Sequence, residues 1–237
     1  MTSSTTAPLD AQRHHPQEDP YRLGHRGSGH GHGHGGYQGD EATGHGEGGP
    51  ASKRIITAYG FWIFLLSDIV MFSAFFASYA VMTGATAGGP SGKDLFDLKI
   101  TAWQTAMLLI SSFTCGLGSI ATYRKDVLWT QIWLFVTGIF GFAFLVMEFQ
   151  EFAHMIHIGA GPQRSGFLSA FFALVGLHGL HVSAGLLWLG TMMAQIWARG
   201  FTDPICRRLL CFNLFWHALD IVWIGVFTIV YLIGSGV

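Results

Sequence analysis

Five apolar stretches, each long enough to cross a lipid bilayer, constrain the fold of this 237-residue chain more than any other feature. They cover approximately residues 59–82, 101–123, 127–158, 167–197 and 212–232. A helix rises about 1.5 Å per residue, so roughly 20 apolar residues span a hydrocarbon core of about 30 Å. Half of all residues are hydrophobic and only 11% are charged, which excludes an ordinary soluble domain. The sequence therefore predicts an all-α fold, a polytopic membrane bundle of five transmembrane helices.

The first 52 residues have a different composition, rich in Gly, His, Ser, Thr and Pro, with almost nothing that could be buried. We expect residues 1–52 to form a disordered tail and residues 53–237 to form the five-helix domain. The tail contains the run His30-Gly-His32-Gly-His34. This run could chelate a transition metal, but alternating glycines fix no ligand geometry, which favours a solvated tail. No apolar core follows a basic start, so the sequence shows no secretory signal peptide.

Net charge and cysteine content exclude two further classes of protein. A formal net charge of −1 leaves no basic surface of the kind that binds nucleic acid. The three cysteines, Cys115, Cys206 and Cys211, have neither the number nor the spacing of a disulfide framework or a thiolate metal site. We therefore interpret them as free thiols.

Basic residues near the ends of the apolar stretches predict the orientation in the membrane, since Lys and Arg accumulate on the cytoplasmic side. Seven lie on the side of the N-terminus and three on the other: Lys53, Arg54, Arg124, Lys125, Arg199, Arg207 and Arg208 against Lys93, Lys99 and Arg164. This asymmetry predicts a cytoplasmic N-terminus. An odd number of spans then places the C-terminus on the periplasmic side of a bacterial inner membrane.

Seven ionisable residues inside the apolar stretches are the candidate functional residues: Asp68, Glu148, Glu151, His178, His181, His217 and Asp220. An ionised carboxylate at the bilayer centre costs about 2.5–3.5 kcal/mol on insertion scales, so such groups turn inward, become neutral or find partners. Counted from the span ends, Asp68, the two central histidines and Asp220 lie about 15–20 Å deep, where they could meet. This depth suggests that Asp68 pairs with a histidine. We expect the two glutamates nearer the outer surface, about half a membrane from His178 and His181.

Three interpretations of these residues are open from their chemistry alone. The pattern Glu148-x-x-Glu151-x-x-His154 contains half of a di-iron site, yet a second such helix is missing, and no haem pocket is outlined either. Intramembrane acids and imidazoles are typical proton-relay groups, but the five spans lack the internal duplication common in transporters. Alternatively, the polar groups hydrogen-bond to one another between helices and hold the bundle together.

Four motifs of this chain are similar, in the same order, to subunit III of the haem-copper terminal oxidases. They are GFWIFLLSDIVMFSAFF (60–76), FLVMEFQEF (144–152), FFALVGLHGLHVSAG (171–185) and FWHALDIVWIGVFTIVYL (215–232). The resemblance covers approximately residues 53–237. Within that family the chain most resembles the five-helix subunit of bacterial cytochrome bo-type ubiquinol oxidases. It has five spans, and it carries Ser67-Asp68 where the cytochrome c branch typically has a glutamate.

The resemblance implies an enzyme complex of the aerobic respiratory chain, a proton-translocating quinol:oxygen oxidoreductase. Haem and copper would lie in the partner subunit I, whereas this chain would carry no catalytic residue, metal ligand or redox centre. It would stabilise subunit I, contact other subunits, bind phospholipid in a cleft between helices and sustain proton uptake. The seven intramembrane residues match the family motifs and are candidates for proton uptake or for the lipid cleft. A cytochrome c oxidase subunit and a stand-alone transporter remain the alternatives.

Overall fold

The computed structural model describes residues 53–88, 92–95 and 97–234, and these residues form helices and turns without a strand. The elements are α1 (Lys53–Met82), α2 (Gly92–Leu95), α3 (Leu98–Tyr123), α4 (Val127–His157), α5 (Gly166–Arg199), α6 (Asp203–Val226) and the π-helical η1 (Phe227–Leu232). Among them, α1, α3, α4, α5 and α6 with η1 form five segments long and apolar enough to cross a membrane. The all-α prediction of five spans is confirmed, whereas the predicted tail, 1–52, lies outside the described residues.

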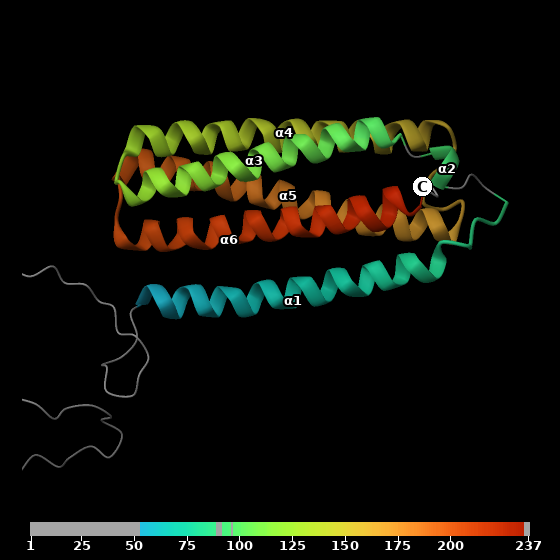
Figure 1. Cartoon of the computed structure of the whole chain (residues 1–237), viewed down its shortest axis with the longest axis horizontal. Helices are drawn as coiled ribbons and strands as arrows, with labels where there is room; N and C mark the ends of the chain where they lie inside the picture. Colours follow the sequence, from blue (N-terminus) through green and yellow to red (C-terminus); the bar gives the residue numbers. More distant parts are fainter. Residues whose placement is uncertain (1–52, 89–91, 96, 235–237) are drawn as a thin grey trace, which may run out of the picture. The chain divides into compact units, whose positions relative to one another are not determined.

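The five long helices form one bundle, with α1 at its edge (Figure 1). Helices α3 and α4 pack against each other along their length, and α6 packs against both α3 and α5. Helix α1 packs mainly against α5 and α6. The start of α1, the α3–α4 turn and the α5–α6 turn lie at the same end of the bundle (Figure 1). The seven basic residues counted on the side of the N-terminus therefore lie at one end.

Local capping signals explain where the helices begin. The Ser165 side chain accepts a hydrogen bond from the Leu168 backbone N–H at 3.2 Å and starts α5. Helix α6 starts at Asp203, with a proline in its first turn, a position that suits a residue without an N–H. The apolar stretches leave residues 198–211 between the last two spans, whereas the connection between α5 and α6 is only 200–202. The short helix α2 was not predicted.

Trp216 of α6 fills a space that two glycines leave open between α4 and α5. A Cβ atom at Gly141 would lie 2.8 Å from Trp216 Cζ2, and one at Gly185 would lie 2.9 Å from Trp216 Cζ3. Close approach of helices at small residues is typical of membrane bundles. At Gly190, by contrast, a Cβ atom would have no neighbouring atom within 4 Å. Gly185 therefore admits a neighbouring helix, whereas Gly190 contacts none.

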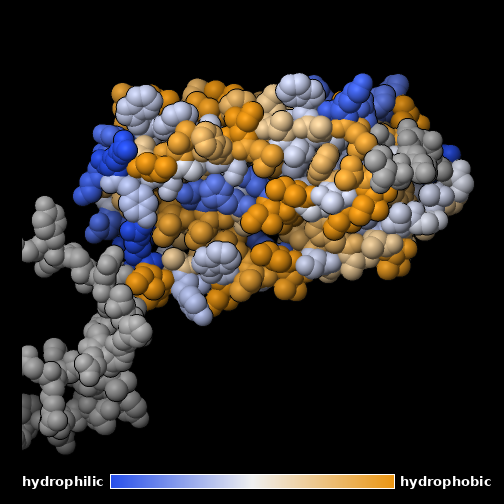
Figure 2. Space-filling view, viewed as in Figure 1, coloured by the Kyte–Doolittle hydropathy of each residue, from blue (hydrophilic) through white to orange (hydrophobic). Residues whose placement is uncertain are grey.

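The outer surface is largely apolar along the helices and polar at the ends (Figure 2). Large hydrophobic side chains are exposed on every long helix, for example Val70 at 69%, Phe142 at 63% and Ile221 at 70%. Such a surface suits the hydrocarbon region of a bilayer. Figure 2 also shows a polar patch midway along the visible face, between α3 and α6.

Candidate functional site

His178 of α5 is enclosed by aromatic rings from three other helices. Its side chain is fully buried, and its ring centroid lies 6.4 Å from that of Phe72 (α1), 5.8 Å from Phe144 (α4) and 5.1 Å from Trp223 (α6). Neither ring nitrogen has a hydrogen-bond partner among the described residues. His178 therefore acts mainly as a packing group that connects four helices.

Glu148 of α4 lies against the backbone of α5 beside His178. A Cβ atom on Gly179 would lie only 2.6 Å from Glu148 Oε1, so the absence of a side chain at Gly179 makes room for the carboxyl group. Glu148 is 3% exposed, and its Oε2 atom has no hydrogen-bond partner in the described part of the chain. Glycine is the only residue that allows this close approach without displacing Glu148.

The expected separation of half a membrane between Glu148 and His178 is wrong. Glu148 contacts Gly179, the next residue after His178, so the two side chains lie at nearly the same level. The sequence turns polar after Met147, which suggested a membrane surface there. However, α4 continues to His157, about two and a half turns beyond Glu148. Glu148 is consequently a deeply buried group of the bundle.

Glu151 joins three elements through two hydrogen bonds. Gln104 Nε2 of α3 donates to Glu151 Oε2 at 3.0 Å, and the Tyr231 hydroxyl of η1 donates to Glu151 Oε1 at 3.1 Å. The sequence analysis missed both donors, because it considered only ionisable residues inside the apolar stretches, and an amide and a phenol are neutral. Gln104 could have been found as a polar amide inside an apolar stretch.

The π-helical turn η1 determines the position of Tyr231. It begins at Phe227, and the backbone N–H of Ile233 donates to the carbonyl of Thr228 at 3.1 Å, five residues earlier. π-helical turns are rare and often occur at functional sites. The Tyr79 hydroxyl of α1 donates to the Val230 carbonyl at 3.3 Å. The end of the last span is thus tied to both α1 and α4.

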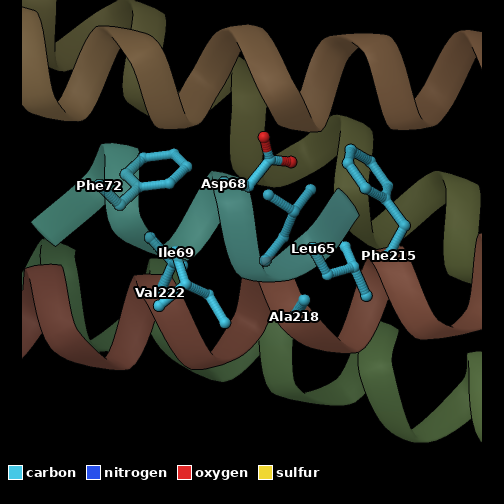
Figure 3. A pocket seen from close by; sticks show the side chains of 8 residues that line it. Leu65, Asp68, Ile69, Phe72, Phe215, Ala218 and Val222 are labelled. Atoms are coloured by element: carbon cyan, nitrogen blue, oxygen red, sulfur yellow. The ribbon is translucent and has the colours of Figure 1, made fainter. Parts of the chain in front are cut away.

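Asp68 lies beside a small pocket between α1 and α6 (Figure 3). Its half-buried carboxylate projects between the rings of Phe72 and Phe215 (Figure 3). The pocket has a volume of about 10 Å³, room for about one water molecule. Asp68 makes no hydrogen bond or ion pair with the residues that the structure describes.

His181 shares the aromatic neighbours of Asp68 but does not pair with it. Its ring centroid lies 5.2 Å from that of Phe72 and 6.5 Å from that of Phe215. Its Nδ1 lies 2.8 Å from the Leu177 carbonyl of its own helix. The suggestion that Asp68 hydrogen-bonds to a histidine therefore finds no support, because the local backbone already holds the nearest imidazole.

A row of polar contacts, which we call the α3–α6 seam, connects α3 and α6. Ser112 Oγ lies 2.6 Å from His217 Nδ1, and Cys115 Sγ donates to Asn213 Oδ1 at 3.1 Å. The other two pairs are indole donors, Trp216 Nε1 to Ser111 Oγ and Trp223 Nε1 to Thr105 Oγ1, both at 3.1 Å. The α3 partners escaped sequence reasoning because short hydroxyl side chains do not interrupt an apolar stretch.

Asp220 lies at the inner side of this seam without a partner. It is 6% exposed, and neither carboxylate oxygen has a hydrogen-bond partner among the described residues. Asp220 follows His217 by three residues, so both lie on the same side of α6. The structure places Ser112 beside Asp220 as well as beside His217.

The seven predicted residues thus form separate small groups rather than one site. Glu148 and His178 lie together, Asp68 and His181 share two phenylalanines, and His217 and Asp220 share the α3–α6 seam. Glu151 is bound by Gln104 and Tyr231. Within the described ranges, no group of three or more His, Cys, Asp or Glu side chains could hold a metal ion. The arrangement is one of contacts between helices.

These features define a class of protein, a polytopic membrane bundle whose intramembrane polar side chains connect its helices. A family model described as "Cytochrome c oxidase subunit III" matches residues 39–235. The chain therefore belongs to the cytochrome c oxidase subunit III family, as the four motifs predicted.

Curated relatives support the same assignment. The chain is 54% identical over 179 residues to "Cytochrome bo(3) ubiquinol oxidase subunit 3" of Pseudomonas aeruginosa. The aligned region covers 76% of this chain and 86% of the relative. The protein of the same name from Buchnera aphidicola subsp. Baizongia pistaciae is 42% identical over 183 residues, with coverages of 77% and 93%. "Quinol oxidase subunit 3" of Bacillus subtilis is 42% identical over 177 residues, with coverages of 75% and 87%.

Proposed function

We propose that this chain is subunit 3 of a proton-translocating ubiquinol oxidase of the bo type in a bacterial inner membrane. The observation that carries the proposal is the identity of 54% to a protein named as that subunit. Five spans and the pair Ser67-Asp68 agree with the quinol branch. The cytochrome c oxidase alternative has less support because the three compared relatives are named quinol oxidase subunits.

Within such a complex, the chain would serve as a non-catalytic subunit beside subunit I, which would hold haem and copper. The bonding of its polar residues supports this role. His178 is surrounded by aromatic rings, His181 and His217 each engage Nδ1 within the bundle, and Glu151 accepts two hydrogen bonds. These groups already serve helix packing.

The outer face of α1 is the surface best suited to subunit I. Only 11% of its most apolar window is buried within the chain, against 33–44% in the other four spans. The exposed hydroxyls of Ser67, Ser73 and Ser78 each donate to a carbonyl of α1 itself. The exposed surface of α1 therefore combines large apolar side chains such as Phe64 and Val70 with small hydroxyls whose donors are satisfied. Small residues of this kind allow close approach of another membrane helix.

A lipid chain would fit a different surface, the groove between α4 and α5. The groove has a volume of about 490 Å³ and is lined by Phe135, Gly138, Ile139, Phe142, Ala143, Leu186, Leu189, Gly190 and Met193. All nine residues lack charged or hydrogen-bonding side chains, so an acyl chain of a phospholipid is the occupant that matches this lining.

Purification through a tag on this chain tests the proposed function. The expected product is a complex that contains haem and copper, oxidises ubiquinol and does not oxidise reduced cytochrome c. Oxidation of cytochrome c instead would support the alternative within the family. A haem-free assembly made only of this chain would refute the proposal.

A further inference from the structure

The α3–α6 seam exposes polar groups in the middle of the membrane-spanning region. Asn213 and His217 are both half-buried, and their spacing of four residues places them on one face of α6. They follow the start of α6 at Asp203 by about 15 Å and 21 Å along the helix axis. Figure 2 shows a polar patch between α3 and α6, on the side of the bundle that is otherwise largely apolar.

Bonds within the chain satisfy these groups only in part. Asn213 uses its amide oxygen to accept from Cys115, and His217 uses Nδ1 towards Ser112. Among the described residues, no contact engages the Asn213 amide nitrogen or His217 Nε2. Unsatisfied donors and acceptors are rarely left against hydrocarbon, because lipid tails offer no hydrogen bond.

The surface beside these groups is open at one glycine of α3. A Cβ atom at Gly116 of α3 would have no neighbour within 4 Å. Gly116 follows Cys115 directly, so it adjoins the contact with Asn213. Small residues at such a position allow two helix backbones to approach closely.

We propose that a transmembrane helix of another oxidase subunit covers the α3–α6 seam and hydrogen-bonds to Asn213 and His217. This inference rests on the proposed function, because it requires assembly of the chain into the oxidase. The two groups lie four residues apart on α6, about 6 Å along its axis and close to one helical turn. A second helix presents polar side chains at the same spacing, whereas a lipid tail presents none.

The double variant Asn213→Leu/His217→Leu distinguishes a polar helix from lipid as the occupant of the seam, because it replaces the two exposed polar side chains with apolar ones. If lipid covers the seam, the variant is neutral or improves recovery of the subunit. If a polar helix covers it, the variant weakens the contact, and we expect at least a tenfold loss of the partner subunit from complexes purified through this chain. Ile221→Leu is the matched control, since Ile221 lies on α6, is 70% exposed and has an apolar side chain.

A photo-crosslinking side chain at Ile221, compared with one at Phe142 on α4, identifies the occupant in the intact oxidase. We expect an adduct at Ile221 that reacts with an antibody to another oxidase subunit and is lost in the Asn213→Leu/His217→Leu background. An adduct with a second copy of this chain, with lipid or with quinone, or no protein adduct, would overturn the inference. If the chain purifies with haem, copper and ubiquinol oxidation in these cases, the proposed function still stands.

Discussion

At the residue scale, the buried polar groups of this bundle differ in how they are accommodated. Glu151 has two hydrogen-bond donors, His178 has aromatic neighbours, and Glu148 has the space that Gly179 leaves. Because charge is costly in lipid, residue type marked these side chains as candidates for burial, and three of the seven, Glu148, His178 and Asp220, are buried. It could not predict their partners, because Gln104, Tyr231 and Gly179 carry no charge pattern that marks them in the sequence.

Gly179→Ala tests the close approach of Glu148 to α5. The added methyl group would lie 2.6 Å from Glu148 Oε1, so the carboxyl group or the helix must shift. We expect a loss of about 1–3 kcal/mol in stability, typical of overpacking, measured as earlier thermal dissociation of the purified complex. Gly190→Ala on the same helix is the control, because no atom lies within 4 Å there. Thermal dissociation of the Gly179→Ala and Gly190→Ala complexes at the same temperature would contradict the close contact between Glu148 and Gly179.

Asp68→Ala tests whether this carboxylate serves turnover or the fold. Asp68 makes no hydrogen bond with described residues, so its removal should leave subunit retention and the initial quinol oxidation rate within about twofold of wild type. If Asp68 contributes to sustained proton uptake, as the family resemblance implies for this subunit, oxygen-consumption progress curves should decline earlier. Asp68→Asn should behave alike, since it also lacks the titratable group. Loss of the initial rate with the subunit fully bound would show an obligatory catalytic role instead.

At the element scale, the five spans could be predicted because apolar length is a local property of the sequence. The start of α6 was placed too late, since Arg207 and Arg208 interrupt the apolar stretch. The missed signal was Asp203-Pro204 after Thr202, a helix-start pattern that outweighs two basic residues near a membrane end. The π-helical turn η1 has no comparable signal, because it depends on contacts of Tyr231 with distant helices.

Glu151→Leu tests the connection of η1 to the bundle. The change removes the acceptor for Gln104 and Tyr231 and leaves the buried Gln104 amide nitrogen without this acceptor, at about 1–3 kcal/mol. We expect faster proteolysis at the C-terminal end and weaker retention of the subunit in detergent. Glu151→Gln should be milder because its amide oxygen still accepts. Gln150→Leu, at an exposed neighbouring position, is the control, and a defect of equal size there would exclude the proposed connection.

At the scale of the whole molecule, one end of the bundle gathers the basic residues of α1 and of two turns. The positive-inside rule assigns this end to the cytoplasm. The C-terminus should therefore lie on the periplasmic side. A reporter enzyme that works only after export should be active when it is fused after Val237, and a reporter enzyme that works only in the cytoplasm should be inactive there. Activity of the cytoplasmic reporter at this end would reverse the proposed orientation.

The central claim is that this chain supports a quinol oxidase without taking part in electron transfer. The most direct test is oxygen consumption by the oxidase purified from cells with and without this chain, with each rate divided by haem content. The account predicts initial ubiquinol oxidation within about twofold in the two preparations and an earlier loss of activity in the preparation without the chain. A complex that retains its haems and copper but lacks any initial rate without this chain would contradict the account.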